Sequence, residues 1–129
     1  MDYAKLPRPF QGALHVTPDE FTLEATRLIV HADKVSFEFS GADGNNGPFD
    51  VSGSAQKTGN GTFLAQSVEP KYKTSIACPI GTIEFLVVDI KEDEAGEVEY
   101  DQCRVEGVWR EPTEQWAFSG TLRAFIPVR

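Results

Sequence analysis

The feature that most constrains the fold is a two-residue alternation of apolar and polar side chains that recurs along the chain. Successive side chains of a β-strand point to opposite faces of a sheet, so this alternation predicts strands with one buried face. Clusters of Gly, Pro, Asn and Asp separate the alternating segments, as expected for turns. We predict eight strands, over residues 10–16, 21–31, 34–40, 48–57, 61–70, 81–91, 97–110 and 115–126.

The connections between these segments indicate antiparallel hairpins. Most of them are too short for the crossover that two neighbouring parallel strands require. Two longer loops remain, at residues 41–47 and 71–80. The short connections consist of turn-forming residues at positions 32–33, 58–61, 94–96 and 111–114.

Residues 18–30 fit two structures. The segment 17–20, Thr-Pro-Asp-Glu, carries the cap residue, the proline and the acid that begin many helices. The β-branched residues that follow lose side-chain freedom in a helix and favour a strand instead. A strand also pairs well with the next one, because a loop at 32–33 sets Leu28 opposite Phe37. We expect a strand here, and a helix is the alternative.

Glycines recur inside the predicted strands, two residues after a large apolar residue and therefore on the same face. Glycine weakens a strand unless crowding or curvature requires it, and small barrels use glycines to curve their sheets. Residues 1–129 are therefore expected to form one all-β domain, an antiparallel up-and-down β-barrel of about eight strands with an N-terminal arm at 1–9. A two-sheet β-sandwich is the alternative. The glycines are Gly41, Gly53, Gly107 and Gly120.

The last hairpin has an expected register. A turn at residues 111–114 sets Trp109 opposite Trp116 and Gly107 opposite Phe118. The Phe118 ring can then cover the gap that the glycine leaves. The inner face of this hairpin is thus predicted to be apolar and closely packed, because the large side chain on one strand fills the gap at the glycine on the other.

Eight antiparallel strands in hairpin order resemble the calycin type of barrel, which lipocalins and avidins represent. Members of those families commonly carry Gly-x-Trp in their first strand, whereas here Gly107-Val108-Trp109 lies in the seventh. The resemblance is therefore limited to the arrangement of the strands, and it assigns no ligand-binding residues to this chain. It implies a barrel whose mouth or interior holds a small apolar molecule.

Charge and hydropathy exclude two classes of partner. The net charge is −8, from 12 basic and 20 acidic residues, and residues 84–114 hold eleven acids against three bases. Such an acidic field repels phosphate groups, so we expect no nucleic-acid partner. No apolar run approaches the roughly 18 residues of a membrane helix, and residues 1–9 lack the apolar segment of a secretory signal. We therefore expect no membrane association and a cytoplasmic location.

The sequence contains no recognisable metal or cofactor motif. Cys78 and Cys103 form no Cys-x-x-Cys pair and have no histidine close in sequence, so we expect reduced thiols. The expected strand pairing separates His15 from His31. The loop at 41–50 contains Asp and Asn oxygens but lacks the acidic spacing of an EF-hand. We expect no metal and no cofactor.

Two groups of residues are candidate ligand-binding surfaces. Tryptophan offers a large rigid area and one hydrogen-bond donor, which is useful at binding sites. The segment 83–90 is apolar on both faces, so its second face needs a cover: the N-terminal arm, a loop, a ligand or the second subunit of a homodimer. The candidate residues are an aromatic cluster of Trp109, Trp116 and Phe118, and a second strand face of Leu86, Val88 and Ile90.

These features favour binding over catalysis. Our leading hypothesis is a small barrel that binds a small apolar ligand or a protein partner. One alternative is an interaction or inhibitor protein that docks its acidic hairpin at 92–101 on a basic partner. Another is a small hydrolase or isomerase that uses Asp50 or Asp89 with a histidine. An empty barrel centre of about 300 Å³ or more favours a ligand inside, whereas a filled centre favours the surfaces.

Overall fold

The computed structural model describes residues 9–18, 21–43, 47–73, 78, 80–91 and 100–125. These residues form nine β-strands joined by turns and short irregular segments. Within this part of the chain there is no helix, and so none that could cross a membrane. The strands are β1 (Pro9–Thr17), β2 (Phe21–Val30), β3 (Lys34–Asp43), β4 (Gly47–Gly59), β5 (Thr62–Val68), β6 (Lys71–Tyr72), β7 (Gly81–Lys91), β8 (Tyr100–Arg110) and β9 (Gln115–Phe125).

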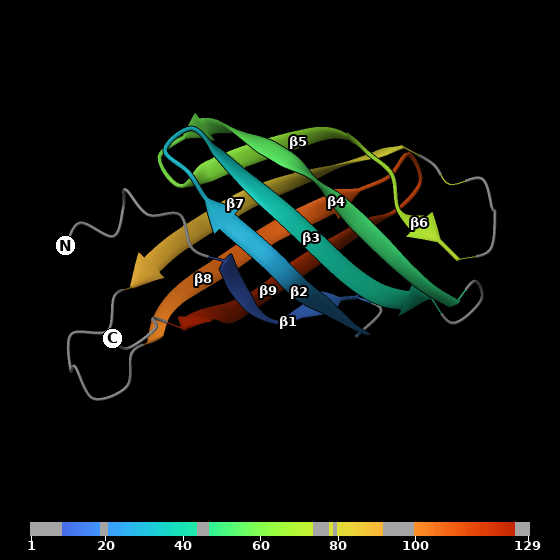
Figure 1. Ribbon diagram of the computed structural model, residues 1–129. Coiled ribbons are helices and arrows are strands. Elements are labelled where there is room, and N and C mark those ends of the chain that lie inside the picture. Colours follow the sequence, from blue (N-terminus) through green and yellow to red (C-terminus); the bar gives the residue numbers. More distant parts are fainter. Residues whose placement is uncertain are drawn as a thin grey trace.

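Eight of the strands close into an antiparallel up-and-down barrel (Figure 1). Each of the eight pairs with the next one along the chain, and β1 pairs with β9 to complete the ring. The remaining strand, β6, adds two residues to the edge of β4. The pairing of β3 with β4 runs along the whole length of β3 and closes the sheet. The predicted barrel is confirmed, and the alternative sandwich is not found.

The strand registers agree with those predicted from the turn lengths. In the hairpin of β2 and β3, Leu28 lies opposite Phe37. In the hairpin of β8 and β9, Trp109 lies opposite Trp116. The segment for which a helix was the alternative is strand β2 from Phe21 onward. Short turns therefore determine which side chains face each other, because they leave no freedom to slip by one residue.

The connection between β5 and β7 differs from the prediction. We expected residues 71–80 to be a loop, but Lys71–Tyr72 form β6. The pairing of β4 with β5 extends only as far as Gln56, and β6 then pairs with Phe49 and Asp50 further along β4. A two-residue strand shows no alternation, so the sequence pattern could not reveal it.

Side chains from the barrel's own strands fill its interior. The rings of Phe37, Phe39, Phe85 and Phe118 meet there with centroids 5.1 to 6.3 Å apart, mostly edge to face. Aromatic rings favour this arrangement, and an eight-stranded barrel is just wide enough for side chains to fill. Each barrel strand also contributes buried aliphatic residues, among them Leu14, Leu23, Val35, Val51, Ala65, Ile83, Val105 and Leu122.

Glycines on the inner face leave room for these rings, as predicted. A Cβ atom at Gly107 would meet the Phe118 ring and would lie 2.5 Å from the Glu84 carbonyl oxygen. At Gly53 the nearest atom to such a Cβ is in the Phe37 ring, at 3.2 Å. The backbone of β7 thus approaches Gly107 too closely for any side chain, whereas the crowding at Gly53 involves only a ring.

Replacing Gly107 with Ala should destabilise the barrel, because the Glu84 carbonyl belongs to a paired strand and cannot move aside. We expect the free energy of unfolding to fall by about 2 kcal/mol, measured by urea denaturation. Gly53→Ala is the matched control, and it should cost less than about 1 kcal/mol because a small movement of the Phe37 ring accommodates the methyl group. Equal losses in the two variants would contradict this account of the core.

Candidate functional site

The filled interior leaves no room for a ligand at the barrel centre. The Phe rings pack against one another and against the aliphatic residues around them, so a molecule there would have to displace core side chains. Three clefts that described residues line all lie on the outer surface. A ligand site on this barrel would therefore lie on the outer surface or at one of the ends.

A row of aromatic rings leads from the interior to the surface at the end of the barrel where β6 lies (Figure 1). We call Phe49, Tyr72, Trp109 and Trp116 the aromatic end. The ring centroids are 5.3 Å apart for Phe49 and Tyr72, 6.0 Å for Phe49 and Trp109, and 6.2 Å for Trp109 and Trp116. Phe49 and Trp109 are buried, and Tyr72 and Trp116 are half-buried. The two outer rings therefore offer apolar surface to a bound molecule.

Trp109 brings a hydrogen-bond donor into this cluster. Its side chain is 5% exposed, and its Nε1 atom is buried without an acceptor among the described residues. A buried donor that stays unsatisfied costs about 1–3 kcal/mol, so native cores rarely contain one. Because the Nε1 atom is buried, an oxygen atom of a bound molecule could accept from this indole N–H only after the side chains around it move.

Phe118, the third residue of the predicted aromatic cluster, lies in the core. It is 2% exposed, and its ring centroid is 5.7 Å from that of Phe85. It is thus part of the scaffold and offers no surface to a ligand. Phe49 and Tyr72 were not among the predicted residues, because their approach to Trp109 depends on the pairing of β4 with β6.

The second predicted surface does not exist as one face. Leu86 is an extra residue that forms a β-bulge after Phe85 and reverses the alternation of β7. Beyond the bulge, Val88 lies opposite the buried Val105, so it points to the interior, and Ile90 shares that face. Leu86, at the bulge, is 45% exposed, and Ile90, near the end of β7, is 40% exposed, but the two residues lie on opposite faces of the strand. The prediction of an outward face formed by Leu86, Val88 and Ile90 is therefore wrong.

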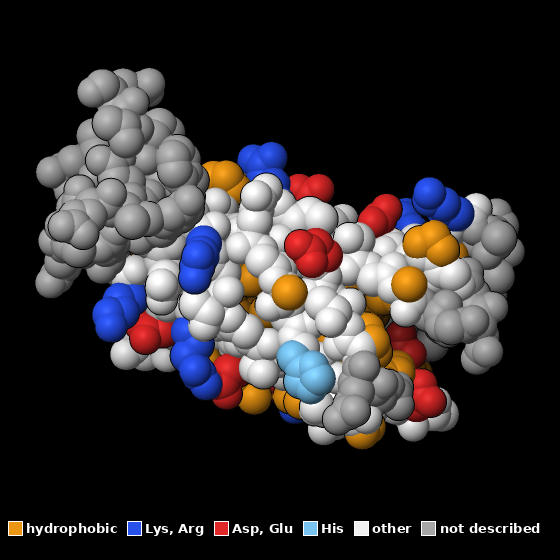
Figure 2. All heavy atoms as spheres, turned by 90° about the horizontal axis from the view of Figure 1, so that it is seen from below, with side chains coloured by type: hydrophobic (Ala, Val, Ile, Leu, Met, Phe, Trp, Pro, Cys, Tyr) orange, Lys and Arg blue, Asp and Glu red, His pale blue; other side chains and the backbone are white. Residues whose placement is uncertain are grey.

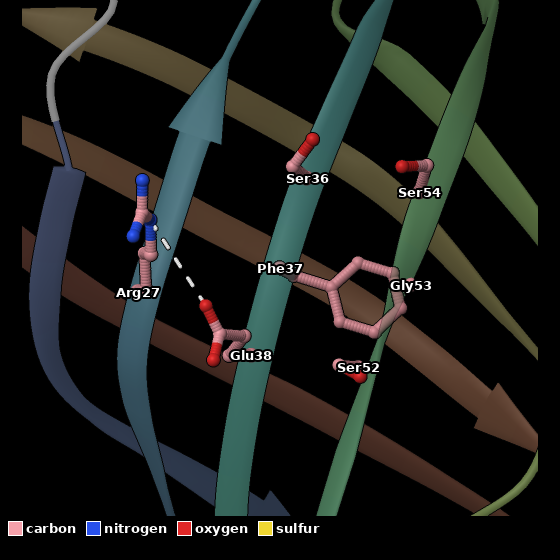
Figure 3. Close-up of a pocket in the computed structure, with 7 residues that line it drawn as sticks. All are labelled: Arg27, Ser36, Phe37, Glu38, Ser52, Gly53 and Ser54. Atoms are coloured by element: carbon pink, nitrogen blue, oxygen red, sulfur yellow. Dashed lines mark ion pairs between the residues drawn. The ribbon is translucent and has the colours of Figure 1, made fainter.

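A polar groove crosses the outer faces of β2, β3 and β4 (Figure 3). Its volume is about 340 Å³, and Ser36, Ser52 and Ser54 line it beside Arg27 and Glu38. The Arg27 Nε and Glu38 Oε2 atoms are 4.0 Å apart, and both side chains are more than half exposed. Exposed ion pairs contribute only about 0–1 kcal/mol. Water therefore competes for the polar groups of this groove.

A larger cleft opens on the outer surface where β6 joins β4. Its volume is about 630 Å³, and we call it the Phe49 cleft because Phe49 forms part of its apolar lining. Its ionic groups are two carboxylates and two ammonium groups, from Glu24, Asp50, Lys71 and Lys73. The same strand junction thus carries the aromatic end on the inside and an ionic cleft on the outside.

Charged side chains of both signs share the surface. On the face shown in Figure 2, Lys and Arg side chains lie among those of Asp and Glu. The acidic hairpin at 92–101 lies outside the described residues, apart from its last two positions. Asp101, the last acid of that segment, is buried and therefore does not belong to an exposed acidic surface.

The Asp–His pair that a hydrolase hypothesis requires is not found in the described part of the chain. His15 lies opposite Thr22, Asp89 lies opposite Arg104, and Asp50 lines the Phe49 cleft without a histidine in its lining. The described residues also contain no group of three or more His, Cys, Asp or Glu side chains that could hold a metal ion.

Cys78 and Cys103 are not joined by a disulfide. Burial raises the pKa of Cys103 to about 12, and the negative charge of Asp89 adds to this effect. Burial and the charges of Glu69 and Glu111 also raise the pKa of Cys78. Because the thiolate is the reactive form, neither cysteine is activated as a nucleophile.

No protein-family model, curated protein or solved structure matches the chain. A barrel architecture alone does not identify a function, because one fold supports many. The candidate function therefore depends on the geometry and chemistry of the aromatic end.

The bulge in β7 can be tested by adding one hydroxyl group at neighbouring positions. Val88→Thr should lower the free energy of unfolding by about 1–2 kcal/mol, because it turns a hydroxyl toward the apolar interior. Val87→Thr lies on the opposite face and should change the free energy of unfolding by less than about 0.5 kcal/mol. Thermal or urea denaturation measures both, and a larger loss for Val87→Thr would place the bulge elsewhere.

The two thiols should differ in accessibility. With 5,5′-dithiobis(2-nitrobenzoate) at pH 8, we expect Cys78 to react in the folded protein and Cys103 to react only after denaturation. Cys103 is buried and its pKa of about 12 keeps it protonated at that pH. A Cys78→Ser variant isolates Cys103, and a fast reaction of this variant in the folded state would refute the buried position.

Proposed function

We propose that this protein binds a small apolar molecule at the aromatic end of the barrel and does so without catalysing its conversion. The observation that carries this proposal is the buried indole N–H of Trp109, which has no acceptor among the described residues. It lies within a cluster of four rings, two of which reach the surface. A ligand with one oxygen acceptor on an apolar body suits this combination.

Apolar contact would supply most of the affinity. Removing apolar surface from water contributes about 25 cal/mol per Å², and the half-buried rings of Tyr72 and Trp116 still have surface to cover. The hydrogen bond from Trp109 would select for orientation, since small-molecule sites combine apolar walls with a few placed polar groups. An aryl or alkyl ketone, ester or amide has the required chemistry.

The architecture supports this location for the ligand. The closed barrel of eight antiparallel strands resembles the calycin type of arrangement, and that resemblance would favour a ligand in the mouth or the interior. Here the Phe rings fill the interior, so the mouth at the aromatic end is the place left. The ligand would thus bind at one end of a rigid scaffold.

Intrinsic fluorescence offers a direct test, because the chain has only two tryptophans and both lie in the aromatic end. We expect saturable energy transfer from them to the neutral dye 6-propionyl-2-(dimethylamino)naphthalene, an apolar ketone whose oxygen can accept a hydrogen bond from the Trp109 N–H. Trp116→Ala should raise the Kd of the dye about tenfold, as expected for an aromatic residue at the centre of a binding site. Trp109 remains as the fluorescence donor in this variant.

Two further variants separate binding from folding. Tyr72→Ala removes the other half-buried ring and should also weaken binding, whereas Leu86→Ala, on the β7 bulge, should leave the Kd unchanged. Circular dichroism establishes that each variant keeps its β-sheet. Absence of saturable transfer in the unmodified protein, or equal weakening by Leu86→Ala, would refute the proposal.

A further inference from the structure

The Phe49 cleft has an ordered floor that strand pairing creates. In one row across the sheet, Glu24 of β2 lies opposite Ser40 of β3, Ser40 opposite Asp50 of β4, and Asp50 opposite Lys71 of β6. Directly opposed residues share a face, so these four side chains project from the same outer surface. Lys73 follows β6 and lines the same cleft. The row is fixed by backbone pairing rather than by flexible loops.

The charges in this row are separated into two sides. The carboxylates of Glu24 and Asp50 come from β2 and β4, whereas the ammonium groups of Lys71 and Lys73 come from β6 and the residue after it. Neighbouring strands are about 4.8 Å apart, so the backbone at Lys71 lies about 5 Å from that at Asp50 and about 14 Å from that at Glu24. The cleft is therefore dipolar, with equal numbers of both charges.

These four groups do not neutralise one another through ion pairs. Within the described part of the chain, none of them has a partner of opposite charge within 4.0 Å. Arginines behave differently on the same barrel: Arg110 Nη1 lies 2.8 Å from Glu84 Oε1, and Arg104 bonds to Glu106. The ionic groups of the cleft are thus available to a ligand.

We propose that the Phe49 cleft binds a small zwitterion. Its ammonium group would lie over Ser40 between Glu24 and Asp50, and its carboxylate would meet Lys71 and Lys73. The Ser40 hydroxyl adds a hydrogen-bonding group at the centre, and Pro48 and Ala42 provide apolar walls for a short carbon chain. This site shares Phe49 with the aromatic end, but it opens on the outer surface and takes a ligand of different chemistry.

Three probes of equal carbon number test the proposal: 4-aminobutanoate, which carries both charges, and butylamine and butanoate, which carry one each. Titrations followed by backbone amide chemical shifts give the Kd for each probe. We expect the zwitterion to bind at least about threefold more tightly than either single-charge probe, since each exposed ion pair contributes modestly. Shifts should concentrate at residues 40–42, 48–50 and 71–73. In about 1 M salt, where screening acts over about 3 Å, the advantage should largely disappear.

Two variants test the acidic and the basic side of the cleft separately. Glu24→Gln should lower the affinity for 4-aminobutanoate toward that for butanoate, with Asp50 left on the acidic side, and Lys73→Gln should lower it toward that for butylamine, with Lys71 left on the basic side. Lys57→Gln, an exposed lysine further along β4, is the matched control and should change nothing. Equal affinities for all three probes, or a loss with Lys57→Gln as large as with Lys73→Gln, would overturn the proposal. Dye binding at the aromatic end is measured separately, so either proposal can fail alone.

Discussion

Closure of the sheet around four phenylalanine rings is the constraint on which the rest of the structure depends. Phe37 and Phe39 come from β3, Phe85 from β7 and Phe118 from β9, and their rings meet at 5.1 to 6.3 Å. Rings of this size fit inside eight strands only where the facing wall has no side chain of its own. Gly107 supplies such a gap under Phe118. A filled centre follows from this packing, and for this reason both proposed binding sites lie outside the core.

Both proposed binding sites lie where regular strand pairing breaks. Along most of the barrel, the ladders satisfy the backbone and the inner side chains fill the core, which leaves little for a ligand. At the junction of β4, β5 and β6, β4 exchanges one partner for another. Ser67 adopts a φ of 58° there, a conformation that costs a non-glycine residue about 1–3 kcal/mol. Both proposed sites adjoin this junction, in agreement with the general tendency of functional sites to break local rules.

How much the sequence could predict depends on whether a feature is local. Turn lengths determined the registers, so the opposition of Trp109 and Trp116 was predictable, and so was the barrel. The bulge at Leu86 was not, because a strand that is apolar on both sides hides the change of face. The members of the candidate site contributed by β4 and β6, Phe49 and Tyr72, were missed for another reason. Their position depends on a two-residue pairing between segments that are separated by a hairpin, and no periodicity marks it.

Strand β6 contributes to both proposed sites because its two residues face opposite ways. Tyr72 packs against Phe49 and completes the aromatic end, whereas Lys71 lies opposite Asp50 on the outside and begins the basic side of the cleft. Two backbone pairs alone would hold so short a strand weakly. The contact between the rings of Tyr72 and Phe49, with centroids 5.3 Å apart, therefore anchors β6. Apolar packing at one face thus positions the charges at the other, and the least regular strand of the barrel connects the two proposed binding surfaces.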